Sequence, residues 1–394
     1  MVRSGLWIVL AASFGFAAGP GATGRGLPGS RAVIEASGFP SLQEAIDALP
    51  AEGGLVRLPP GRFEIGEPLV LERGDVTIEG CGSPTWVVNT NVARQAAIVI
   101  RPPASAGPRE KIWRVQLGNF RLTGSAASGH GIEAVRANEI FLDRLTVSEH
   151  GGDGIRLDNC YEDPRVADCL MTYNKGAGLR LIGNHDIVVV GNHFEENQDA
   201  VVCTDGFNLC MSGNNIDDHL GNGVVIENTY GSQVVGNMIE ECQGTGVILD
   251  RDAYGITITA NVIAHDFGGG VDLRDAHGCA ITGNSFPLCG KFAIRVGPGA
   301  GRNAISGNAI SDSHIGGATK RVKEGENAAA GIVLSGASFL SITGNTFGDL
   351  SAAPIAVEGD APCRKVLIRD NVFTKGGPPE TGLEDSLVSD NLGP

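Results

Sequence analysis

The chain repeats a short pattern, a small residue followed by alternating aliphatic residues. Gly-Val-Val-Ile-Glu at 223–227 returns as Gly-Val-Ile-Leu-Asp at 246–250. Successive copies are 22 to 24 residues apart, with one longer step of 38 residues between Ala293 and Gly331. A fixed period of this length indicates stacked repeats, so this feature limits the possible folds more than any other. The copies begin at Gly131, Gly154, Gly178, Ala200, Gly223, Gly246, Gly270, Ala293, Gly331 and Pro354.

Each copy contains three short runs of alternating residues, which are too short for helices. In the copy that starts at Gly246 the runs are 247–250, 255–259 and 262–264. The pattern predicts an all-β fold with a single domain, a right-handed, single-stranded parallel β-helix with three short strands per coil and about 11–12 coils.

An Asn recurs at one corner of the predicted coil. Its backbone tolerates left-handed geometry, and its amide can hydrogen-bond to the Asn of the coil above and below. We therefore expect a ladder of asparagines along this corner. The corner residues are Asn119, Asn192, Asn214, Asn237, Asn261, Asn284, Asn308, Asn345 and Asn371, with Arg144 and Cys169 in the same position of two early copies.

The ends of such a stack need caps, because they expose sheet edges. Residues 41–50 read as a short amphipathic helix that Ser41 caps, with Glu44 at capping-box spacing, and this helix can cover the first coil. The β-helix domain is expected to span 38–394. Within it, 314–330 form a loop insert beside the strands and 376–394 a C-terminal tail or cap.

The N-terminus resembles an export signal. Residues 1–22 combine a short basic start, an apolar stretch at 6–18 and small residues, and residues 23–37 look like a flexible lead-in. No later segment is apolar enough for a membrane span, so we expect a secreted or periplasmic protein. A disordered hydrophobic tail is the alternative reading of the first residues.

The composition excludes some partners. The formal net charge of −15 argues against nucleic acid, which needs a basic surface. The nine cysteines show no zinc spacing, and no cofactor is certain. Pairs such as Cys203 with Cys210 or Cys160 with Cys169 are compatible with an oxidising compartment, whereas buried thiols in the core are an equally good reading.

The segment 53–82, GGLVRLPPGRFEIGEPLVLERGDVTIEGCG, follows the predicted helix and precedes the Asn-cornered coils. This arrangement, over roughly residues 38–375, resembles the pectate lyase superfamily of right-handed β-helix proteins. The resemblance implies a carbohydrate-active protein, since the superfamily includes polysaccharide lyases, hydrolases, epimerases and fructotransferases. Their catalytic motifs are not matched: Gly-His-Gly at 129–131 lacks a preceding Asp-Asp pair, and DPRVAD at 163–168 has Arg165 where epimerases carry His.

The repeat places charged residues on one solvent-facing strip. Residues two and four after the repeat's Gly should point outward and stack with their equivalents at about 4.8 Å. Two stacked pairs carry like charges, Arg156 over Arg180 and Glu227 over Asp250, and should repel unless a ligand neutralises them. The alternative is that these long side chains simply splay into water.

Each like-charged pair suits a particular chemistry. The arginines could hold a carboxylate or sulfate, and the carboxylates could form an acid/base pair or bind Ca²⁺. Asp272 should lie about 8 Å from Asp250, within the carboxylate separation of inverting glycosidases. The catalytic candidates are Glu227, Asp250 and Asp272. The substrate-binding candidates are Arg156, Arg180, Arg274, Arg295, Tyr161, Tyr230, Tyr254 and His130, the last also a possible general base.

The tyrosines fall in the turn that leaves the strip. Tyr161, Tyr230 and Tyr254 lie seven or eight residues after the repeat's Gly, where they could stack on sugar rings. The sequence therefore predicts an exported protein that binds or cleaves a polysaccharide, as a lyase or a glycoside hydrolase. The alternatives are a non-catalytic surface for carbohydrate or protein and a structural envelope component. The oligomeric state stays open.

Overall fold

The computed structural model describes residue 27, residues 29–311 and residues 330–394. Residues 32–394 form one compact unit, whereas residues 1–31 form a separate unit of which little is described. The expected export signal at 1–22 and nearly all of the expected insert at 314–330 lie outside the described residues. No described helix is long and apolar enough to cross a membrane.

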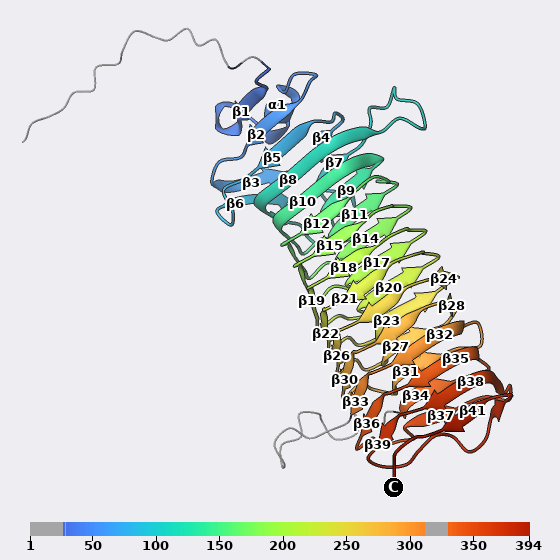
Figure 1. Ribbon diagram of the computed structural model, residues 1–394. Helices are drawn as coiled ribbons and strands as arrows, with labels where there is room; N and C mark the ends of the chain where they lie inside the picture. Colours follow the sequence, from blue (N-terminus) through green and yellow to red (C-terminus); the bar gives the residue numbers. More distant parts are fainter. Residues whose placement is uncertain (1–26, 28, 312–329) are drawn as a thin grey trace, which may run out of the picture. The chain divides into compact units, whose positions relative to one another are not determined.

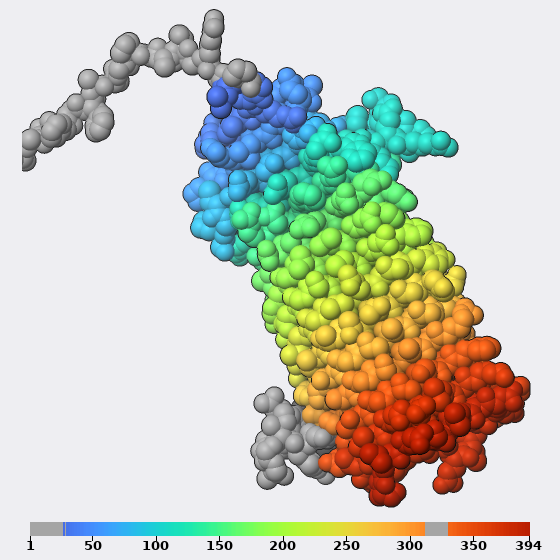
Figure 2. Space-filling view, viewed as in Figure 1, coloured from blue at the N-terminus to red at the C-terminus, as the bar shows by residue number. Residues whose placement is uncertain are grey.

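Residues 32–394 form a parallel β-helix, in which the coils follow one another along the stack (Figure 1). Each coil contributes strands to three faces, which we call the first, second and third face in the order in which the chain visits them. The colours of the space-filling view lie in successive bands, so each coil contacts mainly the coils before and after it (Figure 2).

The first face is a 12-stranded parallel sheet. Its strands are β4 (Leu69–Leu71), β7 (Ile98–Ile100), β9 (Ile132–Val135), β11 (Ile155–Asp158), β14 (Leu179–Ile182), β17 (Val201–Thr204), β20 (Val224–Glu227), β23 (Thr245–Asp250), β27 (Gly269–Leu273), β31 (Phe292–Val296), β34 (Ala330–Leu334) and β37 (Ile355–Val357).

The second face runs further at both ends of the stack. Its strands are β1 (Ala32–Glu35), β2 (Gly54–Arg57), β5 (Val76–Glu79), β8 (Ile112–Thr123), β10 (Ala137–Ser148), β12 (Arg165–Ala167), β15 (Val188–Val190), β18 (Cys210–Ser212), β21 (Gln233–Val235), β25 (Thr257–Thr259), β29 (Ala280–Thr282), β32 (Gly301–Ser306), β35 (Ser338–Thr343), β38 (Cys363–Arg369) and β41 (Leu387–Ser389). The solenoid therefore makes about 14 turns. Twelve of these turns carry a strand of the first face, which agrees with the predicted number of about 11–12 coils.

The third face joins the second in one 29-stranded sheet. It consists of the ends of β8 and β10 and of β3 (Gly61–Ile65), β6 (Thr85–Asn89), β13 (Leu170–Thr172), β16 (His193–Glu195), β19 (Asn215–Asp217), β22 (Met238–Glu240), β26 (Val262–Ala264), β30 (Ser285–Pro287), β33 (Ala309–Ser311), β36 (Thr346–Gly348) and β39 (Val372–Phe373). The short strands β24 (Ala253–Tyr254), β28 (Ala276–His277) and β40 (Leu383–Glu384) lie in the turn between the first and second faces.

The core is a continuous aliphatic column. Side chains alternate along each strand, so every second residue points inward, and Val224, Val247 and Val271 stack on one another in full burial. Burial of such side chains is the main stabilising term of the fold, at about 25 cal/mol per Å² of apolar surface. All nine cysteines are free thiols, and seven of them are buried, so neither suggested disulfide forms.

The predicted asparagine ladder is present at the corner between the second and third faces. Asn214 donates from its side-chain amide to Asn237 at 2.9 Å, and Asn237 donates to Asn261 at 3.0 Å. The ladder runs from Asn192 to Asn391. Buried amides that bond to one another and to backbone leave no polar group unsatisfied.

Two details of the corner were predicted wrongly. The left-handed residue is the one before each ladder asparagine, such as Gly236 with φ 65°, and not the asparagine itself. Asn119 and Arg144 have positive φ and therefore hold this preceding position. Asn119 donates its amide to Glu79 instead of joining the ladder.

A helix caps the first coil, but it is shorter than the predicted 41–50. Helix α1 (Leu42–Asp47) begins after Ser41, whose hydroxyl accepts a hydrogen bond from the Glu44 backbone at 3.2 Å. Gln43 covers the open edge of β4, accepting from the Val70 amide at 2.8 Å and donating to its carbonyl at 3.1 Å. One side chain thus replaces the missing strand at this edge.

The lead-in expected at 23–37 is partly structured. Strand β1 pairs in parallel with β2, and the 3-10 helix η1 (Ala36–Gly38) follows it. The solenoid therefore begins at Ala32, because Ile34 of β1 packs against the core. At the other end, β40 and β41 pair with β38 and close the stack, so residues 376–394 act as a cap.

Candidate functional site

The first face carries the predicted charged strip in the predicted register. Arg156 is the strand partner of Arg180, and Glu227 is the strand partner of Asp250. The period of the repeat therefore places these pairs correctly. Their surroundings differ from what the sequence suggested, because each pair has counter-ions within the chain.

The arginine pair converges on Asp153, a residue that the sequence analysis did not single out. Its carboxylate Oδ2 lies 3.0 Å from Arg180 Nε and 3.9 Å from Arg156 Nη1, and its side chain is only 5% exposed. Its Oδ1 accepts a hydrogen bond from the Ala177 amide at 2.8 Å. Arg156 also lies 3.4 Å from Asp158 Oδ2 and 4.0 Å from Glu133 Oε1. No ligand is needed to neutralise the two guanidinium groups, since Asp153 and these two carboxylates do so together. The detectable signal was a carboxylate directly before the repeat's Gly154.

His130 belongs to the same cluster. Its Nδ1 accepts a hydrogen bond from the Asp153 amide at 2.9 Å, so the neutral ring carries its proton on Nε2. The same Nδ1 lies 3.4 Å from Asp153 Oδ2, a contact that becomes an ion pair only when the ring is protonated and the bond from the amide is lost. In the neutral state His130 presents a donor and not the base that the sequence suggested.

The carboxylate pair is also matched by arginines. Glu227 pairs with Arg251 at 3.0 Å, and Asp250 lies 3.8 Å from Arg274. The Arg251 amide donates to Asp250 at 2.8 Å. Both carboxylates remain partly exposed, so a ligand could reach them from solvent.

Asp272 does not face solvent, in contrast to the prediction. Its side chain is 1% exposed and is held by Arg274 Nε at 2.8 Å and Arg295 Nε at 2.9 Å. It opposes Ile248 in the sheet, and the hydrogen bond to its carboxylate raises the pKa of Arg295. These contacts occupy both carboxylate oxygens, so Asp272 has a structural environment.

Arg295, which holds Asp272, also packs against an apolar cluster. Phe292, Ala330 and Val333 form a second buried apolar cluster separate from the main core. The Phe292 ring lies against Gly269, where a Cβ would meet it at 2.3 Å, and the Arg295 guanidinium stacks 4.8 Å from the ring centre. The accessible carboxylates of the strip are therefore Glu227 and Asp250, and beyond them the strip presents the partly exposed guanidinium groups of Arg274 and Arg295.

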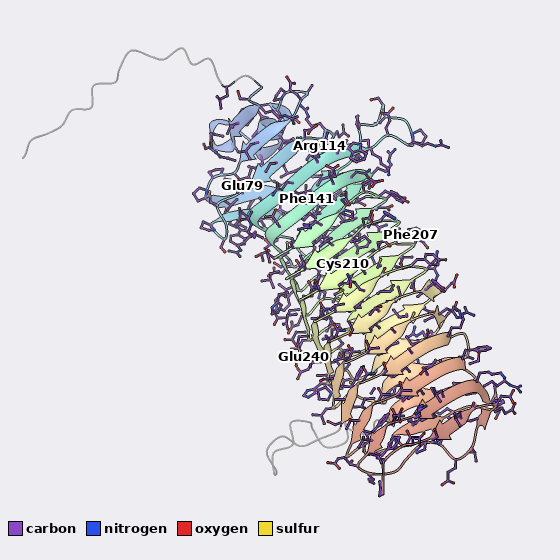
Figure 3. The ribbon with its side chains drawn as sticks, viewed as in Figure 1. Glu79, Arg114, Phe141, Phe207, Cys210 and Glu240 are labelled. Carbon is purple, nitrogen blue, oxygen red and sulfur yellow. The ribbon has the colours of Figure 1, made fainter. Side chains whose placement is uncertain are left out.

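An aromatic ladder lies in the turn between the first and second faces. It comprises Tyr161, His185, Phe207, Tyr230 and Tyr254, whose neighbouring ring centroids are 4.9, 5.7, 5.5 and 6.4 Å apart. Parallel backbone bridges join all but the first of these residues to the next coil. Phe207 marks the edge of the solenoid at which the ladder lies (Figure 3). The rings are accessible, with Tyr161 40% and Tyr254 49% exposed.

The ladder confirms the repeat position of the three tyrosines and adds His185, which the sequence analysis missed. His185 follows Gly178 by the same seven residues, so the period alone could have found it. Polar groups accompany the rings. The Tyr230 hydroxyl donates to Asp252 at 3.3 Å, and this carboxylate raises the pKa of Tyr230.

A metal ion has a different candidate position from the predicted Glu227 and Asp250. In the described residues, the ligand oxygens of Asp217, Asp218 and Glu241 lie within 4.8 Å of one another. These residues lie where strands β19 and β22 of the third face end. Burial, together with neighbouring carboxylates, raises the pKa of Asp217 to about 6. These oxygens are the ligand type that Ca²⁺ prefers, and calcium binding stays a prediction.

Comparison of the sequence with known families identifies the fold family. The family model of the right-handed beta helix region matches residues 76–239 and 222–384. The chain belongs to the right-handed β-helix family. This β-helix protein therefore has the handedness that the crossover rule predicts, and its resemblance in fold to the pectate lyase superfamily is confirmed. No curated protein matches its sequence.

Solved β-helix proteins share the fold at low identity. The A-module of the mannuronan C-5 epimerase AlgE4 from Azotobacter vinelandii is 15% identical, with a TM-score of 0.59 over 84% of this chain and 98% of that one. PfbA, a surface adhesin of Streptococcus pneumoniae, is 11% identical, with a TM-score of 0.58 over 82% and 93%. The catalytic unit of a GH87 alpha-1,3-glucanase from Streptomyces thermodiastaticus is 16% identical, with a TM-score of 0.56 over 95% and 70%.

Proposed function

We propose that this β-helix protein binds a polysaccharide and that the aromatic ladder is its stacking surface. The observation that carries the proposal is the ladder itself, an unbroken row of partly exposed rings in a chain with only 5% aromatic residues. Neighbouring rings stack partly on one another, and the ring surface that stays exposed can attract the weakly positive C–H groups on the face of a sugar ring. A row of such rings can hold successive units of a chain.

The polar groups beside the ladder suit sugar hydroxyls. The carboxylates of Asp252 and Asp275 lie next to Tyr230 and His277, with Asp275 Oδ1 3.1 Å from His277 Nε2. Carboxylates accept hydrogen bonds from hydroxyl groups. A small number of precisely placed polar groups beside an apolar surface is typical of ligand sites. The mannuronan epimerase and the alpha-1,3-glucanase that share the fold are both named for polysaccharides, which supports the proposal.

Cleavage of the polysaccharide is a second candidate function. One observation favours it: Glu227 and Asp250 are direct strand partners with partly exposed side chains on the strip, next to the ladder. Direct strand partners lie about one strand spacing apart, which matches a retaining hydrolase better than an inverting one. As such a hydrolase, the protein would use one carboxylate as the acid and the other as the nucleophile; as a lyase, it would need a base near the sugar carboxylate. We do not include Asp272, since two arginines occupy its oxygens.

The localisation follows the same proposal. Residues 1–22 would direct the protein to a secreted or periplasmic location, where polysaccharides are accessible. Exported protein should therefore lack these residues, which N-terminal sequencing of the protein recovered outside the cytoplasm would establish.

A screen of the purified protein against polysaccharides tests the function. The panel should include mannuronan, polygalacturonate, α-1,3-glucan and β-1,4-glucan, with binding read as retardation in affinity gels. New ultraviolet absorbance would indicate a lyase, and new reducing ends without it would indicate a hydrolase. Binding without either product supports the binding role, and no binding to any member of a broad panel would contradict the proposal.

A further inference from the structure

From His185 onward, the residue directly after each ring of the ladder is left-handed, and its side chain changes along the stack. Asp186 and Asn208 hold this position first, with φ of 55° and 53°, and the Asn208 amide donates to the Asp186 carboxylate at 2.9 Å. The next three coils carry Gly231, Gly255 and Gly278, with φ of 58°, 65° and 61°. The row of side chains therefore stops at Asn208 and bare backbone follows.

A trough begins where these side chains stop. It has a volume of about 450 Å³ and is lined by Asn208, Cys210, Gly231, Gln233, Gly255 and Thr257, among others. It lies over β18, β21 and β25 on the second face, beside the ladder. Cys210 lies on this face, whereas Phe207 lies at its edge (Figure 3).

Gly255 makes room in the trough and is not required by crowding, whereas a Cβ at Gly231 would lie 3.1 Å from Asn208 Oδ1. A Cβ at Gly255 would meet nothing closer than the Gly231 backbone nitrogen at 3.9 Å. The left-handed geometry does not demand glycine here either, because Asp186 and Asn208 adopt it in the preceding coils. At Gly278, in contrast, a Cβ would lie 3.3 Å from the Tyr254 ring, which extends toward the next coil.

The lining of the trough is polar but uncharged. Asn208, Gln233 and Thr257 offer amides and a hydroxyl, and the Gln233 amide donates to the Cys210 sulfur at 3.2 Å. No Lys or Arg of the described chain lines the trough, while Asp186 and Asp252 lie near the ladder. An anionic sugar would lack a counter-ion here, whereas hydroxyl groups would find donors and acceptors.

We infer that this trough is a subsite for an uncharged sugar unit of a chain that stacks on Tyr230 and Tyr254. The inference rests on the proposed function and deepens it in two ways. It assigns a neutral polysaccharide as the ligand class, and it extends the binding surface around the turn onto the second face. The charged strip of the first face is then not the main recognition surface.

Cys210 is a built-in reporter for this subsite. Only Cys81, which is exposed, and Cys210, which is half-buried, are accessible among the nine thiols. Burial raises the pKa of six of the other thiols, for example that of Cys203 to about 12, which makes them poor nucleophiles. Cys289 is 2% exposed and therefore inaccessible. In a Cys81→Ser background, the rate of alkylation therefore reports the accessibility of Cys210 alone.

The first test follows that alkylation with iodoacetamide. Uncharged hexasaccharides of α-1,3-glucan or β-1,4-glucan should slow labelling of Cys210, whereas hexamannuronate should not. Equal labelling with and without a bound uncharged chain would overturn the subsite. Protection by hexamannuronate but by no uncharged chain would overturn the ligand class.

The second test restores the missing side chain. Gly255→Asn places in the trough the residue that Asn208 already provides at the same left-handed position. Affinity for the uncharged chain should fall about tenfold. Gly283→Asn is the matched control, since Gly283 has φ 63° at another corner and open space around it. Unchanged affinity in Gly255→Asn would overturn the subsite while leaving the proposed function intact. Absence of any binding by the native protein would overturn both the subsite and the proposed function.

Discussion

Asp266 accepts a hydrogen bond from the Cys242 amide at 3.0 Å, in the position where Asn197 accepts one from the Asn174 amide at 3.1 Å. Asn197 also donates to the Met171 carbonyl at 2.8 Å, whereas Asp266 Oδ2 is buried without a partner. Burial raises the pKa of Asp266 well above its ordinary value. A carboxyl group thus occupies a position that other coils fill with an amide.

The substitution Asp266→Asn should therefore stabilise the protein. A raised carboxyl pKa means that its contribution is most favourable at low pH and is lost as pH rises above the ordinary carboxyl pKa. The amide should restore the missing bond and increase stability by about 1–3 kcal/mol at neutral to alkaline pH. Thermal unfolding at several pH values measures this, with Asp252→Asn on the surface as control. A lower melting temperature for Asp266→Asn at alkaline pH would contradict the expectation.

Two buried histidines predict a loss of stability in acid. Burial lowers the pKa of both His150 and His219 to about 4. The unfolded chain takes up protons near pH 6.5 that the folded chain refuses, so stability falls between about pH 6.5 and 4 by up to about 3 kcal/mol for each residue. His219→Asn should flatten this fall, whereas His185→Asn, which changes a partly exposed ring, should not. Identical pH profiles for His219→Asn and the native protein would refute the explanation.

Removal of Asp153 should loosen its part of the first face. Asp153→Ala removes the carboxylate that contacts Arg180 and Arg156 and leaves the Ala177 amide without its acceptor. The expected cost is about 1–3 kcal/mol, because both guanidinium groups stay partly exposed and Arg156 keeps Asp158. Asp153→Asn should cost less, because it keeps an acceptor for the amide. Hydrogen exchange should rise around β11 and β14 and remain unchanged around β34. Unchanged exchange at β11 in Asp153→Ala would show that the cluster does not hold the coils together.

The catalytic candidate makes a separate prediction. If Glu227 and Asp250 cleave a bound chain, Glu227→Gln and Asp250→Asn should each reduce turnover by about 100-fold or more with little change in binding. Asp272→Asn is a poor control because it breaks a buried ion pair, so Asp205→Asn serves instead. Persistent product formation in both variants would exclude the pair.

The sequence period predicted the solenoid and the strand partners on each face, because one repeat copies its geometry to the next. It could not predict that Arg156 and Arg180 would turn toward Asp153, since side-chain direction depends on contacts between coils. The burial of Asp272 accompanies its ion pairs with Arg274 and with Arg295 of the next coil, which no alternation along one strand encodes. The ladder position of Asn119 was wrong by one residue, because the repeat is irregular in the first coils.

The aromatic ladder is the central claim, and a double variant tests it most directly. Tyr230→Ala combined with Tyr254→Ala should lower affinity for the polysaccharide found in the screen by about 100-fold, since each lost ring contact is worth on the order of 1.4 kcal/mol. Tyr173→Ala, which removes an exposed tyrosine outside the ladder, should leave the affinity unchanged. Full binding by the folded double variant would contradict the account.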